Sequence, residues 1–204
     1  DVLVNFDGIT YAKGASVLRQ LVAWVGQENF MAGVRAYIAQ HAWGNTELPD
    51  LMSELEAASG RDLSEWTRVW LETSGVNTLR TEVETDEAGT ITALRLRQSA
   101  PDGSPSAPGD DVLRPHRLAV GFYDVDEATG RLTRTERFEL DVAGEVTEVV
   151  EAAARRRPAV ILPNDDDLAY AKLRLDDASW EAASTRLKDV DGSLARTLLW
   201  SAAW

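Results

Sequence analysis

The sequence predicts an α+β protein of several domains, and two changes of hydrophobic period support this prediction. Apolar residues recur every three or four positions over residues 1–78, alternate with polar residues over 79–163, and return to helical spacing over 164–204. With 204 residues and 44% apolar side chains, the chain can form more than one packed core. We therefore expect a helical part, then a β-sandwich, then the start of a second helical part.

The first part is expected to contain four helices. Gly26 ends the apolar stripe of the first helix, and the second helix runs to His41. Pro49 lies in the first turn of the third helix, and Gly60 follows its last turn. These helix-start and helix-stop residues place the four helices in series along the chain.

The fourth helix has its own starting signal. Asp62 and Glu65 are spaced as a helix cap and its partner three residues on, so we expect a capping box there. Trp66 and Trp70 follow on one face. Together with Trp200, near the end of the chain, they occupy core-like helical positions and are expected to anchor packing between domains.

The middle of the chain is expected to form short antiparallel strands joined by polar turns. Residues 101–110, rich in Pro, Gly, Ser and Asp, predict a mobile surface loop between two hairpins. Such a set of strands is typical of a β-sandwich. The strands are expected at residues 81–84, 91–98, 116–125, 131–140, 146–150 and 159–162.

Helical spacing returns after Pro163, at Leu168, Lys172 and Leu175, and predicts the beginning of a further helical domain. Residues 164–167 read Asn-Asp-Asp-Asp, and clustered carboxylates suit calcium. Their spacing lacks the alternation of a calcium loop. A polar turn with a helix cap is the better interpretation.

Composition excludes several classes of function. The net charge of −13 repels phosphate backbones, and the basic run at residues 155–157 is expected to be a solvated helix end or turn, so we expect no nucleic-acid partner. No apolar stretch is long enough to cross a bilayer, so no membrane association is expected. The absence of cysteine excludes disulfides and cysteine-based zinc sites and suits a reducing compartment, so a cytoplasmic location is expected. The start at Asp1, without a basic leader, predicts a cut inside a longer protein.

The most informative segment is Ile-Thr-Tyr-Ala-Lys-Gly-Ala-Ser-Val-Leu at residues 9–18, where the first helix begins. It resembles the Tyr-x-Lys-Gly-Ala segment of the M1 zinc aminopeptidases, the family of aminopeptidase N. The resemblance continues in the family's own order of parts, and its later parts look actinobacterial. These further segments are Gln27-Glu28-Asn29-Phe30 with Gly33, Tyr37 and His41-Ala42-Trp43-Gly44; Asp62-Leu63 with Trp66, Trp70, Ser74-Gly75 and Thr78-Leu79; and residues 162–166 with 170–176.

The resemblance implies a layout for the chain. Residues 1–78 would be the helical end of a thermolysin-like catalytic domain, 79–163 a β-sandwich domain, and 164–204 the start of a C-terminal helical domain. The family's Gly-x-Met-Glu-Asn segment, its His-Glu-x-x-His helix and its third zinc ligand, a glutamate, all lie upstream of the tyrosine and are not in this sequence. The chain would then be a C-terminal-side fragment that binds no zinc and is inactive alone. The zinc-dependent parent would remove N-terminal residues from peptides.

By this resemblance Tyr11 is the catalytic residue of the chain. Its phenol would donate a hydrogen bond to the negatively charged tetrahedral intermediate, because a phenol O–H is a good donor near neutral pH. The alternative is an aromatic packing residue at a helix start. Gly14 is expected to let the helix approach a neighbouring backbone. Lys13 either orders the cleft wall through a carboxylate or is a solvated charge.

Neither histidine is expected to bind a metal. His41 lies at a helix C-terminus, where it complements the helix dipole, and His116 lies in a strand of a different domain, so both are expected to be structural. Two rivals to the aminopeptidase remain, a non-catalytic scaffold or interaction module of an M1-like protein and a leukotriene-hydrolase-like relative. The sequence predicts neither the preferred N-terminal residue nor an oligomeric state.

Overall fold

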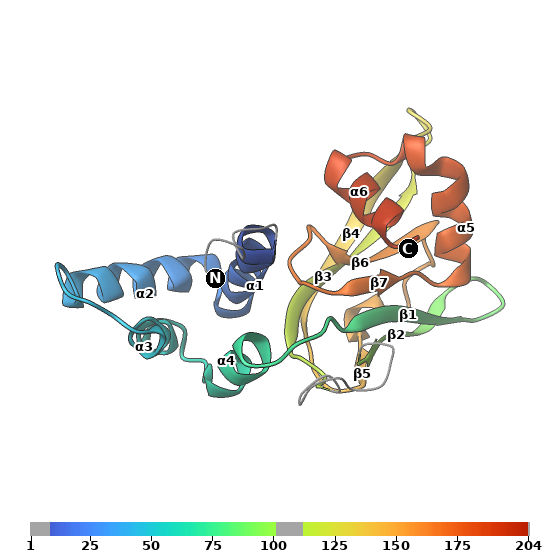
Figure 1. Ribbon diagram of the computed structural model, residues 1–204. Helices are drawn as coiled ribbons and strands as arrows, with labels where there is room; N and C mark the ends of the chain where they lie inside the picture. The colour runs from blue at the N-terminus through green and yellow to red at the C-terminus, as the bar shows by residue number, and fades with distance from the viewer. Residues whose placement is uncertain (1–8, 101–111, 204) are drawn as a thin grey trace. The chain divides into compact units, whose positions relative to one another are not determined.

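The computed structural model describes residues 9–100 and 112–203, and it divides the chain into two compact units (Figure 1). Unit 1 is Asp1–Thr73 and unit 2 is Ser74–Trp204. The loop predicted at residues 101–110 lies outside the described residues. Within the described ranges, none of the helices combines the length and apolar character that a membrane span requires.

Unit 1 is helical, as predicted. A π-helical turn, η2 (Ile9–Lys13), leads directly into the first α-helix. Gly26 separates the first two α-helices at φ 86°, a left-handed backbone region that glycine adopts without strain. Gly60 ends the third helix in the left-handed conformation. The four α-helices are α1 (Gly14–Val25), α2 (Gln27–Gln40), α3 (Leu48–Ser59) and α4 (Ser64–Leu71).

A small residue and a set of apolar side chains pack the helices of unit 1. A Cβ atom placed on Gly33 of α2 would lie 2.8 Å from Leu55 Cδ2, so glycine permits the close approach of α2 to α3. Leu63, Trp66 and Trp70 are buried, as expected for the two tryptophans. The rings of Trp66 and Trp70 lie 6.2 Å apart, so they pack against each other in the core of this unit.

The capping box predicted at Asp62 and Glu65 is wrong. Leu63 is the N-cap of α4, and Asp62 Oδ1 accepts a hydrogen bond from the Ser64 N–H at 2.8 Å. Glu65 instead binds Arg68 three residues on, at 2.6 Å, so its carboxylate does not reach back to the helix start. The buried position of Leu63 fixes where the helix begins. A capping box does occur at α3, between the residues at positions 47 and 50.

Unit 2 contains two sheets that share one hydrophobic core. All six predicted strands are present, with bounds that differ by a few residues, and a seventh was not predicted. One sheet has the order β5-β2-β1-β7 and the other β4-β3-β6. The strands are β1 (Thr78–Thr85), β2 (Ile91–Ser99), β3 (His116–Val125), β4 (Leu132–Val142), β5 (Val146–Glu148), β6 (Val160–Asp165) and β7 (Lys172–Arg174).

The helical interpretation of Leu168, Lys172 and Leu175 is wrong. Residues 172–174 form β7, which pairs in parallel with β1, and Leu173 lies opposite Leu79 in that pairing. Leu173 and Leu175 are both buried while Lys172 is exposed, which is the alternation of a strand. The helical spacing of three residues concealed this shorter period.

The predicted return of helix is confirmed a few residues later. The helices α5 (Asp177–Arg186) and α6 (Ser193–Ser201) follow β7 and contact β6 (Figure 1). Leu198 and Leu199 of α6 belong to the core that the strands form. Residues 164–204, predicted as the start of a separate domain, therefore lie in the same compact unit as the strands. Trp200 is 60% exposed, so its predicted core position is wrong.

Candidate functional site

Tyr11 lies in η2, the π-helical turn that precedes α1. π-Helical turns are rare, and they are frequent at functional sites. The side chain of Tyr11 is 63% exposed, so it does not belong to the core of unit 1. Among the described residues of unit 1, Tyr11 is therefore not a buried packing residue.

The residues that follow Tyr11 shape the junction between η2 and α1. Lys13 has α-helical backbone angles and makes no side-chain cap. Ser16, in the first turn of α1, donates a hydrogen bond from Oγ to the Ala12 carbonyl at 2.9 Å. A Cβ atom on Gly14 would meet no described atom within 4 Å, so the close backbone approach expected there does not involve the described residues.

An apolar groove adjoins this junction within unit 1. It has a volume of about 410 Å³, in the range of small-ligand sites. Leu18 and Leu71, on its wall, are exposed, and the buried indole Nε1 of Trp66 has no hydrogen-bond partner among the described residues. The groove is lined by Lys13, Gly14, Val17, Leu18, Leu21, Leu48, Leu51, Met52, Trp66, Trp70, Leu71 and Thr73.

The described residues do not fit a zinc ion. Among them, no group of three or more His, Cys, Asp or Glu side chains could hold a metal. His41 ends α2, its backbone N–H bonds the Tyr37 carbonyl, and its ring lies 5.5 Å from the Tyr37 ring. His116 is buried in unit 2, where Nε2 lies 2.8 Å from Gln98 Oε1. Burial, with a smaller effect of the Arg114 charge, lowers the pKa of His116 to about 3, so this imidazole is neutral.

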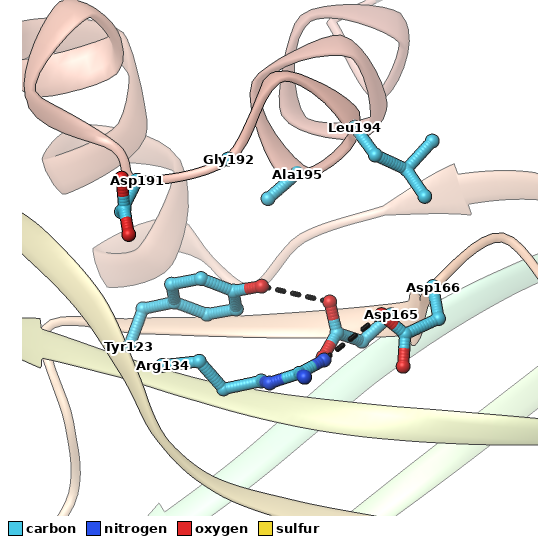
Figure 2. Close-up of a pocket in the computed structure, with 8 residues that line it drawn as sticks. All are labelled: Tyr123, Arg134, Asp165, Asp166, Asp191, Gly192, Leu194 and Ala195. Atoms are coloured by element: carbon cyan, nitrogen blue, oxygen red, sulfur yellow. Dashed lines mark hydrogen bonds and ion pairs between the residues drawn. The ribbon is translucent and has the colours of Figure 1, made fainter.

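A second pocket lies in unit 2, beside the N-terminus of α6, with a volume of about 240 Å³ (Figure 2). Its floor is a polar cluster. The Tyr123 hydroxyl donates to Asp165 Oδ1 at 2.8 Å, and Arg134 Nη1 donates to Asp165 Oδ2 at 2.7 Å and to Asp166 Oδ1 at 2.9 Å. We call these four residues the Tyr123 cluster. It joins β3, β4 and the end of β6.

The electrostatics of the Tyr123 cluster indicate a structural role. Burial, and then the hydrogen bond to Asp165, raise the pKa of Tyr123 well above its ordinary value. The hydrogen bond to Asp165 raises the pKa of Arg134. Tyr123 therefore stays protonated and Arg134 charged, and both oxygens of Asp165 are occupied. The polar side chains of the cluster thus satisfy one another.

The sequence did not reveal the Tyr123 cluster. One available signal was Gly121 within a strand pattern, because a glycine there marks a close approach. A Cβ atom on Gly121 would lie 2.5 Å from Asp165 Oδ2. The polar turn predicted at residues 164–167 is confirmed by positive φ angles at three of its residues, but it leads to β7 and caps no helix. Asp165 and Asp166 bind arginine side chains, which accounts for the acidic run without calcium.

Comparisons with known proteins place these findings in context. Residues 1–70 match the model of the peptidase family M1 domain. Aminopeptidase N of Streptomyces lividans is 57% identical over all 204 residues, which cover 24% of that protein. Aminopeptidase 2 of Candida albicans is 32% identical over 145 residues, 71% of this chain and 15% of that protein. The chain thus spans about a quarter or less of these relatives.

A solved structure with the same fold supports the comparison. The crystal structure of Legionella pneumophila aminopeptidase A in complex with aspartic acid matches 94% of this chain and 20% of that chain, with a TM-score of 0.66. The sequence identity is 17%, so this likeness concerns the fold alone. Both the helical unit and the strand-rich unit lie within the matched span.

Proposed function

Since this chain belongs to peptidase family M1, we propose that it is part of a zinc-dependent aminopeptidase that hydrolyses N-terminal residues from peptides, and that Tyr11 stabilises the transition state of that reaction. The proposal rests on one observation above all. The predicted catalytic tyrosine lies within the segment that matches the family domain, in a π-helical turn, with its side chain 63% exposed. A ring placed in this way can reach a bound substrate.

The chemistry required of Tyr11 is donation of a hydrogen bond. Attack on a peptide carbonyl turns the carbonyl oxygen into an oxyanion, and a donor already aimed at that position lowers the barrier. A phenol O–H is such a donor, and it contributes without giving up its proton. Loss of a single donor of this kind typically lowers turnover by about 10²–10³-fold. This is the whole contribution that we assign to Tyr11.

The zinc ion is part of the proposal because the family is zinc-dependent. None of the described residues is proposed to bind it. Because those residues do not fit the ion, its ligands would belong to other parts of the protein. The two histidines retain the structural positions described above.

The peptide substrate and the absence of activity in the isolated chain are part of the same proposal. The named relatives are aminopeptidases, and the chain spans about a quarter or less of their length. A cytoplasmic location, with neither nucleic acid nor membrane as partner, stays a prediction from the sequence. The rival function, a non-catalytic interaction module, makes the opposite prediction for Tyr11, since its hydroxyl would then have no kinetic role.

The test replaces Tyr11 by Phe in the full-length protein. We expect kcat on an aminoacyl p-nitroanilide to fall by about 10²–10³-fold, with zinc content and KM nearly unchanged. Tyr37→Phe is the matched control. It removes another phenol hydroxyl from the same unit, one that lies 2.5 Å from Thr46 Oγ1, and it should leave kcat unchanged. A fall of less than tenfold for Tyr11→Phe with zinc still bound would contradict the proposed role.

A further inference from the structure

We propose that Ser16 is a positioning residue for Tyr11, because its hydroxyl holds the junction between the π-helical turn and α1. This inference rests on the function proposed for Tyr11. Ser16 itself would not touch the substrate. Its effect would pass through the backbone of η2 to the tyrosine ring.

The geometry places one hydrogen bond across the junction. Ser16 belongs to α1 and Ala12 belongs to η2, and Ser16 Oγ donates to the Ala12 carbonyl at 2.9 Å. Ala12 directly follows Tyr11 in the chain. Lys13, the residue at the junction, makes no side-chain cap of its own. The Ser16 hydroxyl is therefore a side-chain tie between the regular helix and the turn that carries Tyr11.

The physical effect of such a tie depends on where it lies. A serine hydroxyl that bonds the carbonyl four residues earlier bends a helix locally. A π-helical turn is less favourable than α-helix and persists where surrounding interactions maintain it. If the turn relaxed to α-helical winding, residues ahead of the junction would rotate about the helix axis relative to α1. Tyr11 would then point in a different direction.

A hydrogen bond of the same type occurs within a regular α-helix elsewhere in the chain, and it serves as a comparison for the Ser16 bond. Thr197 Oγ1 donates to the Ser193 carbonyl, also four residues earlier and also at 2.9 Å. That bond lies entirely within the α-helix α6 of unit 2. A mild local bend is all that it would produce. What distinguishes Ser16 is that its bond joins two kinds of helical turn next to the proposed catalytic side chain.

The experiment measures the kinetics of Ser16→Ala, Ser16→Thr and Thr197→Ala in the full-length protein. We expect kcat of Ser16→Ala to fall by about tenfold, part of the value of a fully aligned donor, with KM and zinc content unchanged. Ser16→Thr keeps a hydroxyl that can bond the same carbonyl and should restore most of the activity. Thr197→Ala should leave kcat unchanged. Equal kcat values for Ser16→Ala and the unsubstituted protein would overturn the proposal.

A double substitution separates positioning from general stability. If Ser16 acts through the Tyr11 hydroxyl, Ser16→Ala should cause no further loss when it is added to Tyr11→Phe. Multiplicative losses would show that Ser16 acts in another way and would overturn the positioning role. A large loss for Tyr11→Phe with none for Ser16→Ala defeats this inference alone. Full activity of Tyr11→Phe defeats the proposed function, and this inference with it. Thermal unfolding of each variant checks that it is folded.

Discussion

Tyr11 and Tyr123 lie in different units of the chain and have opposite surroundings. Tyr11 is 63% exposed on a π-helical turn, whereas Tyr123 is 4% exposed and donates its hydroxyl to the buried carboxylate of Asp165. The two side chains have the same chemistry. The two residues differ in burial, and the buried hydroxyl of Tyr123, held by the Asp165 carboxylate, acts as a structural tie.

The contrast extends to the regions around the two residues. The wall of the apolar groove at the junction between η2 and α1 leaves the large side chains of Leu18 and Leu71 exposed. Around Tyr123, hydrogen bonds within the Tyr123 cluster connect residues of three strands. The hydrophobic core of this unit contains residues from both sheets. We expect substitutions in the first region to change activity, and substitutions in the second to change stability.

The largest expected effect comes from replacing each of the two tyrosines by phenylalanine in a separate variant. Tyr11→Phe should lower kcat by about 10²–10³-fold with little change in the free energy of unfolding. Tyr123→Phe should leave kcat unchanged and lower the free energy of unfolding by about 1–3 kcal/mol, because Asp165 loses a donor in a buried site. Steady-state kinetics and urea unfolding measure the two effects. The contrast fails if both variants lose activity and stability alike.

The next prediction concerns the space that Asp165 occupies. Gly121→Ala should lower the free energy of unfolding by about 3 kcal/mol, since its Cβ would lie 2.5 Å from Asp165 Oδ2 and 2.9 Å from a ring atom of Tyr123. Gly130→Ala provides a partial control, because it adds a methyl group where no described atom lies within 4 Å, though at a positive φ. Equal unfolding midpoints for Gly121→Ala and the unsubstituted chain would show that the cluster is loosely packed.

A smaller effect should appear in the pH dependence of stability. Folded His116 has a pKa of about 3, against 6.5 for an ordinary histidine. As the pH falls below 6.5, the unfolded chain gains a proton that the folded chain does not, so stability is greatest above 6.5 and is lost progressively down to about pH 3. Between pH 6.5 and about pH 5 the loss should be about 2 kcal/mol.

His116→Gln isolates this contribution, because glutamine does not titrate and can still bond Gln98. The difference in stability between the two chains should shrink or change sign as the pH falls from 6.5 to about 5. Urea unfolding at several pH values measures it. A difference that is constant with pH would show that His116 keeps its ordinary pKa in the folded chain.

The smallest effect is expected when zinc is titrated into the 204-residue chain and the heat of binding is measured by calorimetry. The described residues contain no group that fits the ion, so we expect no tight stoichiometric binding. Addition of excess zinc should also leave the thermal midpoint unchanged. A one-to-one complex of submicromolar affinity would mean that the chain carries its own metal site, and it would remove the reason for assigning the ligands to other parts of the protein.

Local patterns in the sequence predicted much of this fold. Helix-stop residues such as Gly26 and Gly60 function as expected, and alternation located six strands. β7 was missed because three residues are too few to show a period, and the surrounding leucines also fit a helix. The capping box at α4 was misplaced because packing of Leu63 determines the start of that helix.

The candidate site was predicted only in part. The residues around Tyr11 identified it by resemblance, but no spacing in the sequence distinguishes a π-helical turn from the α-helix that follows it. The Tyr123 cluster could not be predicted, because its partners are 31 and 42 positions apart in the chain and meet only when three strands pair. Short-range chemistry can be recognised in a sequence, whereas contacts made by sheet topology require the structure.

The parallel pairing of β1 with β7 has a consequence for how the protein is synthesised. The Asp176 N–H bonds the Thr81 hydroxyl at 2.9 Å, and the two residues are 95 positions apart. While the ribosome makes the intervening segment, one edge of β1 has no neighbouring strand, and an open strand edge invites pairing with other chains. Completion of that sheet must therefore wait until residues 172–174 leave the exit tunnel.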